Sequence, residues 1–138
     1  MLKLYLVPVE DIDFYWEQVS GFINSALALA GGEATLADIL LMIQQRELDL
    51  WIAWDNAELK CVAACTTMIQ SYPRFKSCTI VHFGGTTIKA VDQLLPKIQQ
   101  WAKQQGCKKI RVYGRKAWVK HLTNHGFNYR FTCVEAEI

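Results

Sequence analysis

Three strand-like segments follow one another closely in the middle of the chain, and this arrangement constrains the fold most. They cover residues 49–54, 59–70 and 75–83, and short polar connections separate them. Strands joined by short connections are antiparallel neighbours, because a parallel pair needs a long crossover. The middle of the chain is therefore predicted to form an antiparallel three-stranded sheet.

The elements around this sheet alternate between helices and strands. A first strand is predicted at residues 2–7, and apolar residues at helical spacing predict helices at 9–30 and 36–45. Thr35, with Asp38 three residues later, is close to a capping box for the second of these helices.

Beyond the three central segments, the pattern predicts a strand–helix–strand crossover, which makes its two strands parallel. Its helix spans about 90–105, and Pro96 inside it marks either the true helix start or a kink. A strand at 108–113, a short helix at 114–124 and a final strand at 127–138 complete the chain. The predicted order is β-α-α-β-β-β-α-β-α-β, in a single mixed α/β domain over residues 1–138.

Acidic and basic side chains are segregated along the chain. Residues 1–59 carry ten acidic and two basic side chains, a net charge of −8, whereas residues 60–138 carry three acidic and thirteen basic ones, a net charge of +10. Two interpretations are open. The basic half binds an anion, such as a phosphorylated cofactor or a nucleic acid, or the two halves attract each other within one molecule or across a dimer.

The five cysteines are an odd number in a chain of ordinary size and lack the spacing of a metal finger. They are predicted to be free thiols, mostly buried, in a reducing compartment, and no metal site is predicted. No apolar run reaches the length of about 18 residues that would span a membrane. The N-terminus also lacks the pattern of a signal peptide, so a cytoplasmic protein with no membrane contact is expected.

Several motifs resemble one superfamily. The helix ending in Trp101–Gly106, the strand Ile110–Val112 and the short helix leading into Gly126-Phe127 resemble the C-terminal half of the Gcn5-related N-acetyltransferases (GNAT). The segments TLADI, LWI, YPR, FGG and GRKAW more narrowly resemble divergent GNAT-like proteins of tailed phages and prophages. The resemblance covers nearly the whole chain. It implies a mostly antiparallel sheet with helices on both faces.

The resemblance also implies a site for acetyl-CoA. In GNAT proteins, the strand before the long helix splays from the strand after it. The pantetheine arm pairs with backbone groups in the gap, here those of residues 81–83. The loop at the start of the long helix presents amides to the pyrophosphate. The residues implied as cofactor contacts are Val81, Phe83, Gly84, Gly85, Thr86, Thr87, Lys89 and Arg115.

The loop departs from the GNAT pattern Arg/Gln-x-x-Gly-x-Gly/Ala. That pattern falls on residues 86–91, where Lys89 and Val91 stand in place of the glycines. A degenerate anion-binding loop is one interpretation. The other is an ordinary strand-to-helix turn in which Gly84 or Gly85 supplies a positive φ.

Two residues are candidates for acid–base catalysis. GNAT proteins often place a tyrosine four residues before the Gly-Phe pair, but this chain has Leu122 there. Tyr113, at the end of the preceding strand, is the candidate acid, with an amphipathic packing role as the alternative. His82 is the candidate base, because residues 77–83 contain no acid and a neutral imidazole accepts a proton. A histidine packed on the sheet face is its alternative.

The resemblance implies a phage-type N-acyltransferase that uses an acyl-CoA to modify an amine. The alternative is a non-catalytic GNAT-like binding or virion-assembly protein. A nucleic-acid binder is the least favoured candidate, with Trp118 either stacking on bases or fixing its helix to the sheet. The expected partner is an unknown acceptor or a protein, a homo-oligomer is compatible with the charge pattern, and a phage-encoded protein would reside in the host cytoplasm.

Overall fold

In the part of the chain that the structure describes, five strands form one sheet, and their order in the sheet is their order in the sequence. The computed structural model describes residues 2–28, 31–114 and 117–138. Neighbouring strands are antiparallel except for the last pair, which is parallel. The strands are β1 (Leu2–Leu6), β2 (Asp49–Asp55), β3 (Lys60–Ser71), β4 (Lys76–Gly85) and β5 (Cys107–Val112). The predicted fold class, a mixed and mostly antiparallel sheet, is confirmed.

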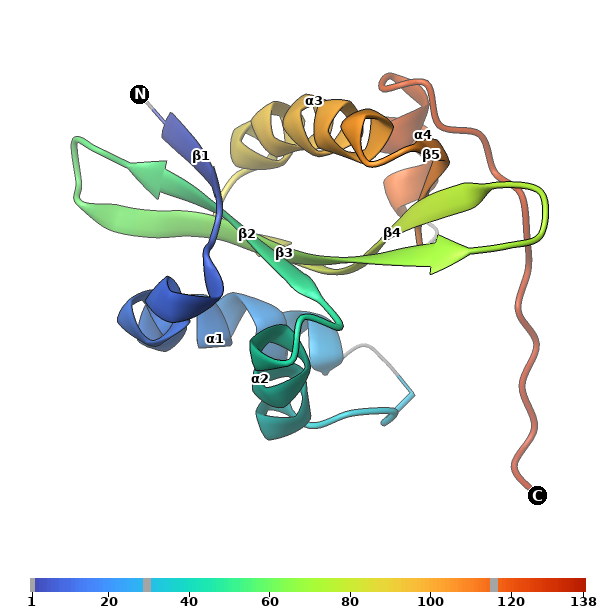
Figure 1. Ribbon diagram of the computed structural model, residues 1–138, viewed down its shortest axis with the longest axis horizontal. Helices are drawn as coiled ribbons and strands as arrows, with labels where there is room; N and C mark the ends of the chain where they lie inside the picture. Colours follow the sequence, from blue (N-terminus) through green and yellow to red (C-terminus); the bar gives the residue numbers. More distant parts are fainter. Residues whose placement is uncertain (1, 29–30, 115–116) are drawn as a thin grey trace.

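Helices cover both faces of the sheet (Figure 1). The pair α1 and α2 lies on one face and α3 lies on the other, while α4 packs against the core beneath α3 through Trp118 and Leu122. They are the 3-10 helix η1 (Val9–Asp11) and the α-helices α1 (Ile12–Leu27), α2 (Leu36–Gln44), α3 (Ile88–Gln104) and α4 (Ala117–Thr123). The unit β4–α3–β5 is a parallel crossover, as the sequence predicts.

The predicted capping box at the start of α2 is confirmed. The Thr35 hydroxyl accepts a hydrogen bond from the Asp38 amide at 3.2 Å, and the Asp38 carboxylate accepts one from the Thr35 amide at 2.9 Å. Each side chain satisfies a backbone donor that the helix itself cannot. This reciprocal pair determines where α2 begins.

Pro96 lies inside α3, which runs from Ile88 to Gln104. The interpretation of Pro96 as the start of the helix is therefore wrong. The helix begins two turns earlier, where the Thr87 side chain accepts a hydrogen bond from the Ala90 amide. A proline cannot donate to the carbonyl four residues before it, here that of Asp92. Burial of the apolar face of α3 against the sheet offsets this lost hydrogen bond.

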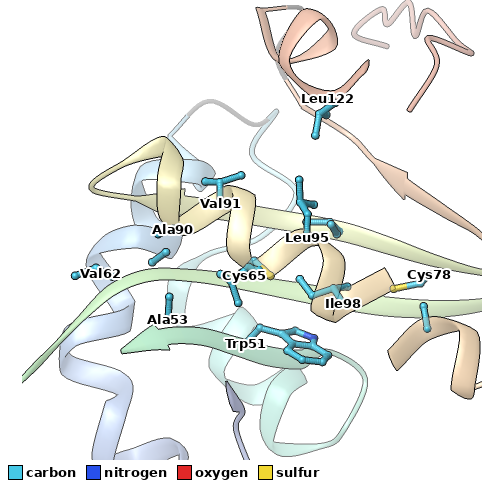
Figure 2. Close-up of a cluster of buried hydrophobic side chains, with 14 residues drawn as sticks. Trp51, Ala53, Val62, Cys65, Cys78, Ala90, Val91, Leu95, Ile98 and Leu122 are labelled. Carbon is cyan, nitrogen blue, oxygen red and sulfur yellow. The ribbon is translucent and has the colours of Figure 1, made fainter. Parts of the chain in front are cut away.

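Each face of the sheet has its own apolar core. Beneath α3, a cluster that includes Trp51, Cys65, Cys78 and Leu95 fills the space against β2, β3 and β4 (Figure 2). A second cluster lies between the other face of the sheet and helices α1 and α2. The sheet is thus buried on both sides, which explains why β2 and β3 are apolar along most of their length instead of alternating.

The predicted final strand at residues 127–138 does not form. The segment has no regular secondary structure and extends away from the body of the protein (Figure 1). Phe127, Tyr129 and Phe131 give it a strand-like alternation with polar residues. A strand, however, exists only where a neighbouring strand accepts its hydrogen bonds, and the alternation alone does not supply one.

The cysteines are free, as predicted. Cys61, Cys65 and Cys78 are buried in the sheet, Cys107 is partly buried, and Cys133 is exposed in the C-terminal segment. Burial raises the pKa of the Cys61 thiol to about 11 and that of Cys78 to about 12. Thiols in such surroundings stay protonated and inert at neutral pH.

Within the described residues, direct ion pairing between the acidic and basic halves is slight. Across residues 2–28, 31–114 and 117–138, the one ion pair that joins the acidic and basic halves is Glu58–Lys60, at 2.9 Å within a single hairpin. Both side chains are more than half exposed, so this contact contributes little stability. Within the described residues, short ion pairs therefore do not account for the charge pattern, and both interpretations of it stay predictions. In the same residues, no helix is long and apolar enough to cross a membrane.

Candidate active site

The parallel ladder between β4 and β5 ends early, and this opens the sheet at one end. Ile80 pairs with Val112, the last residue of β5. β4 nevertheless continues to Gly85, paired with β3. The backbone of Val81 to Gly85 thus has no strand on its β5 side within the described part of the chain. The predicted cofactor residues Val81 and Phe83 both lie in this stretch.

A bulge in β4 begins where the opening begins. Thr66 pairs with His82, but the next residue of β3, Thr67, pairs with Ile80, so Val81 is an extra residue in β4. Such a bulge bends a strand and re-aims the side chains that follow it. Val81 packs against the core beneath α1 and α2, whereas Phe83 packs against the core beneath α3.

His82, the candidate base, follows the bulge directly. It is 9% exposed, and its Nδ1 lies 2.7 Å from the Thr66 hydroxyl oxygen. Burial lowers the pKa of its imidazole, because the charged form loses its hydration. The ring is therefore neutral at pH 7 and able to accept a proton, while Thr66 fixes its orientation.

Tyr113, the candidate acid, is the residue after Val112. It is 59% exposed, so its hydroxyl is accessible to solvent and to ligands. Because Val112 forms the last pair with Ile80, Tyr113 stands where β5 leaves the sheet. His82 in β4 and Tyr113, just after the end of β5, thus flank the same opening.

Gly84 and Gly85 lie in β4 and not in the loop that follows it. Neither has a positive φ, so the predicted glycine turn is wrong, whereas their predicted contact with the cofactor stays a prediction. A Cβ atom on Gly84 would lie 2.5 Å from the carbonyl oxygen of Phe22 in α1, and one on Gly85 would lie 3.0 Å from the Cβ atom of Ala63. Close packing, not backbone freedom, therefore requires glycine at position 84, whereas a Cβ atom at position 85 would need Ala63 to shift by a few tenths of an ångström.

The loop between β4 and α3 consists of Thr86 and Thr87. The amide and hydroxyl of Thr86 donate to the Val62 carbonyl at 2.9 and 3.3 Å, which fixes the loop to β3. The Thr87 hydroxyl caps α3 by accepting a hydrogen bond from the Ala90 amide. At the start of α3, the amides of Ile88 and Lys89 therefore face outward as the positive end of the helix dipole.

A cavity of about 320 Å³ adjoins this helix end. Thr86, Thr87 and Lys89 line it, so the structure brings these three predicted cofactor residues together. Asp55, Glu58 and Lys60 from the β2–β3 hairpin line it as well. Its two carboxylates balance its two lysines, and the cavity as a whole is not strongly positive.

Helix α4 covers the opening on the α3 side. Trp118 packs against Phe83 with ring centroids 6.2 Å apart, which agrees with a role in fixing the helix to the sheet. Leu122, where GNAT proteins often have tyrosine, is 8% exposed and belongs to the core (Figure 2). Arg115, predicted to contact the cofactor, lies outside the described residues.

The structure also gathers three residues that the sequence analysis missed. Asp92 of α3 faces His121 of α4 and His125 just beyond it, with hydrogen-bond contacts at 2.6 and 3.0 Å. The two histidines are four residues apart in the sequence, a spacing that places side chains one helical turn apart. Asp92 comes from a different helix, and only the fold brings it to them.

Comparison with known proteins gives a consistent picture at the level of the fold. No protein-family model matches the sequence, and no curated protein matches it. Solved structures do match. An acetyltransferase from Trypanosoma brucei superposes with a TM-score of 0.73 and 17% identity over 100% of both chains.

Two further structures are similar. Glucosamine-6-phosphate N-acetyltransferase from Arabidopsis thaliana has a TM-score of 0.71 and 14% identity, over 99% of this chain and 98% of its own. A predicted acetyltransferase with acetyl-CoA from Clostridium acetobutylicum has a TM-score of 0.71 and 15% identity, over 99% and 96%. At these identities the likeness concerns the fold alone. The chain has the fold of the GNAT acetyltransferases.

Proposed function

We propose that the protein is an N-acyltransferase that transfers an acyl group, acetyl in the simplest case, from a CoA thioester to an amine. The observation that carries the proposal is the early end of the β4–β5 ladder at Ile80 and Val112. An extended strand with one free backbone edge offers amide and carbonyl groups to a ligand as it would to another strand. The pantetheine arm, with its two amide groups, suits that edge.

The proposed cofactor site follows from this placement. The arm would pair with the backbone of Val81 to Phe83, and the pyrophosphate would lie at the start of α3, near Thr86, Thr87 and Lys89. The amides of Ile88 and Lys89 and the helix dipole favour an anion there. Arg115 remains a proposed further contact. Gly84 and Gly85 remain proposed contacts as well, through their backbone groups in the stretch of β4 that extends beyond β5.

The proposed chemistry assigns one proton transfer to His82 in β4 and another to Tyr113, just after β5. His82 takes a proton from the acceptor's ammonium group, and the free amine then attacks the thioester carbonyl carbon. As the tetrahedral intermediate collapses, the carbon–sulfur bond breaks and Tyr113 donates a proton to the leaving thiolate. The second proton on the attacking nitrogen then returns to the Tyr113 oxygen, which leaves a neutral amide, the CoA thiol and a neutral Tyr113, while His82 releases its proton to solvent. The burial of His82 supports this role, because it keeps the imidazole neutral at pH 7.

An activity assay with matched variants tests these roles. Release of CoA from acetyl-CoA is followed with a panel of primary amines, in a Cys133→Ser background that removes the exposed thiol. His82→Gln and Tyr113→Phe are expected to lower kcat by about 10²- to 10⁴-fold, the usual contribution of a general base or acid. Tyr129→Phe is the matched control for Tyr113→Phe, because both tyrosines are 59% exposed.

A non-catalytic binding or assembly protein is the second candidate. Two observations favour it: Leu122 is buried where a catalytic tyrosine often stands, and Val91 is buried where the cofactor loop would need a glycine. This candidate predicts neither turnover nor thermal stabilisation by acetyl-CoA. A phage origin would fit it equally well, with a partner protein in place of an acceptor amine. Stabilisation by acetyl-CoA together with turnover would exclude it.

A further inference from the structure

Asp92, His121 and His125 converge on one point between α3 and α4. The Asp92 Oδ1 atom lies 2.6 Å from the Nε2 atom of His121 and 3.0 Å from that of His125. One ligand-type atom from each residue lies within 4.8 Å of the other two. The side chains are 39%, 25% and 18% exposed, so water reaches the point from one side. A single carboxylate oxygen is thus shared by two imidazoles.

The geometry points to a zinc site at this position, with three protein ligands and a fourth position open to water. Two imidazole nitrogens and a carboxylate oxygen are ligands that suit zinc, and three such ligands plus water are typical of its open sites. Zinc bonds of about 2.0–2.2 Å in a tetrahedron place neighbouring donors about 3.3 Å apart. The observed separations of 2.6 and 3.0 Å need to widen by less than about 1 Å.

The scaffold holds both histidines in place. His121 is on α4, and that helix ends in a Schellman motif, with the Phe127 amide donating to the Leu122 carbonyl and the Gly126 amide to that of Thr123. Gly126 has a φ of 84°, as this motif requires. The motif determines the backbone position of His125, one turn after His121.

A second contact ties His125 to α3. The Gln99 side chain donates to the His125 carbonyl at 3.5 Å. Gln99 lies seven residues after Asp92, so both are on the side of α3 that faces α4. The site therefore rests on elements fixed by backbone motifs and core packing. A metal site needs such support, because its ligands must be in position before the metal binds.

A bound zinc would join α3 to α4, the two helices that flank the sheet opening on that face. This inference does not rest on the proposed function, because it uses no residue of the proposed cofactor or catalytic site. It predicts a zinc complex of the free protein, with no acetyl-CoA present.

Titration calorimetry with zinc chloride tests the inference. The protein carries Cys133→Ser, because that exposed thiol is an alternative ligand for zinc. One zinc is expected per chain, with no response to magnesium, which prefers oxygen ligands. Asp92→Asn and His121→Gln are each expected to raise the Kd for zinc more than about tenfold. Substitution of a residue that only hydrogen-bonds a metal ligand already weakens binding by at least about that factor, and these two residues are ligands themselves. Asp13→Asn removes an equal charge from an exposed helical position and should leave the Kd unchanged.

X-ray absorption at the zinc edge gives a readout that does not depend on any variant. The zinc-loaded protein is expected to have two imidazole nitrogens and one or two oxygens at about 2.0–2.2 Å. Circular dichroism verifies that each variant is folded. If Asp92→Asn or His121→Gln does not fold, His125→Gln is titrated in its place. Absence of binding up to millimolar zinc overturns the inference. A Kd that Asp92→Asn does not alter overturns it equally, because the cluster would then be only a hydrogen-bonded triad.

Discussion

Ile80 and Val112 are the last residues that pair across β4 and β5, and they set the length of the free backbone edge beyond them. The bulge at Val81 follows immediately, so the strand changes direction at the point where it loses one neighbour. A short β5 and a bulged β4 together produce the opening on which the proposed cofactor site depends. The catalytic candidate His82 lies within this stretch of β4, and Tyr113 directly follows the last residue of β5.

Glycine at position 84 is predicted to matter for stability. Gly84→Ala would place a Cβ atom 2.5 Å from the backbone oxygen of Phe22, and neither strand nor helix yields easily. We expect a loss of about 1–3 kcal/mol in the free energy of unfolding, as for other overpacked cores. Chemical denaturation measures it.

Gly21→Ala is the matched control. This glycine is inside α1, and a Cβ atom there meets nothing within 4 Å. The substitution should stabilise the protein by roughly 0.5–1 kcal/mol, because glycine is unfavourable in a helix interior. An equal change in the free energy of unfolding for Gly84→Ala and Gly21→Ala would show that the close approach of β4 to α1 does not cause the loss of stability.

His82 is predicted to make stability depend on pH. Its pKa is lowered by burial in the folded protein, so the unfolded chain takes up a proton that the folded protein resists. The stabilisation from neutral His82 is complete above the unfolded pKa of about 6.5 and declines as the pH falls below it. The slope is no more than about 1.4 kcal/mol per pH unit, the limit for one proton.

Denaturation of the wild type and of His82→Gln between pH 7.5 and 5 separates this contribution from that of other groups. The difference in unfolding free energy between the two proteins should shrink as the pH falls below about 6.5. A difference that stays constant would mean that His82 titrates alike in the folded and unfolded states.

The cysteines are predicted to react with a thiol reagent in two groups. Cys133 is exposed and should react fastest, with the partly buried Cys107 slower. Cys61, Cys65 and Cys78 should react only on unfolding, because burial raises the pKa of each thiol. Mass spectrometry of the labelled protein, with and without denaturant, identifies the sites. Rapid labelling of Cys65 under native conditions would contradict the packing beneath α3.

Much of the fold could be predicted from periodicity and local chemistry. Helical spacing identified α1 and α3, and the Thr35–Asp38 pair identified the start of α2. These signals are local, so the sequence carries them directly. The alternation of residues 127–138 was misleading, because strand formation depends on a neighbour elsewhere in the chain.

The candidate site was less predictable for a similar reason. Gly84 and Gly85 look like turn residues, but both lie in β4, and Gly84 permits the close approach of α1, which is a tertiary contact. Asp92 gave no signal in the sequence, since its partners His121 and His125 come from another helix. Spacing within one element was readable, whereas contacts between elements were not.

Charge at the start of α3 is predicted to control cofactor binding. Lys89→Glu reverses the charge beside the amides that would face the pyrophosphate, and it should weaken acetyl-CoA binding at least tenfold if the pyrophosphate lies there. Lys97→Glu makes the same change on an exposed position of the same helix, away from its N-terminus, and should have little effect. Equal losses in both variants would point to net charge instead of a site.

Calorimetric titration of acetyl-CoA into the wild-type protein, with dephospho-CoA as a comparison, tests the central claim most directly. The account predicts binding at micromolar strength, because the free edge of β4 and the start of α3 would hold the pantetheine arm and the pyrophosphate. Absence of heat at millimolar acetyl-CoA, in protein shown to be folded, would contradict it. The opening between β4 and β5 would then be a feature of the fold that binds no CoA.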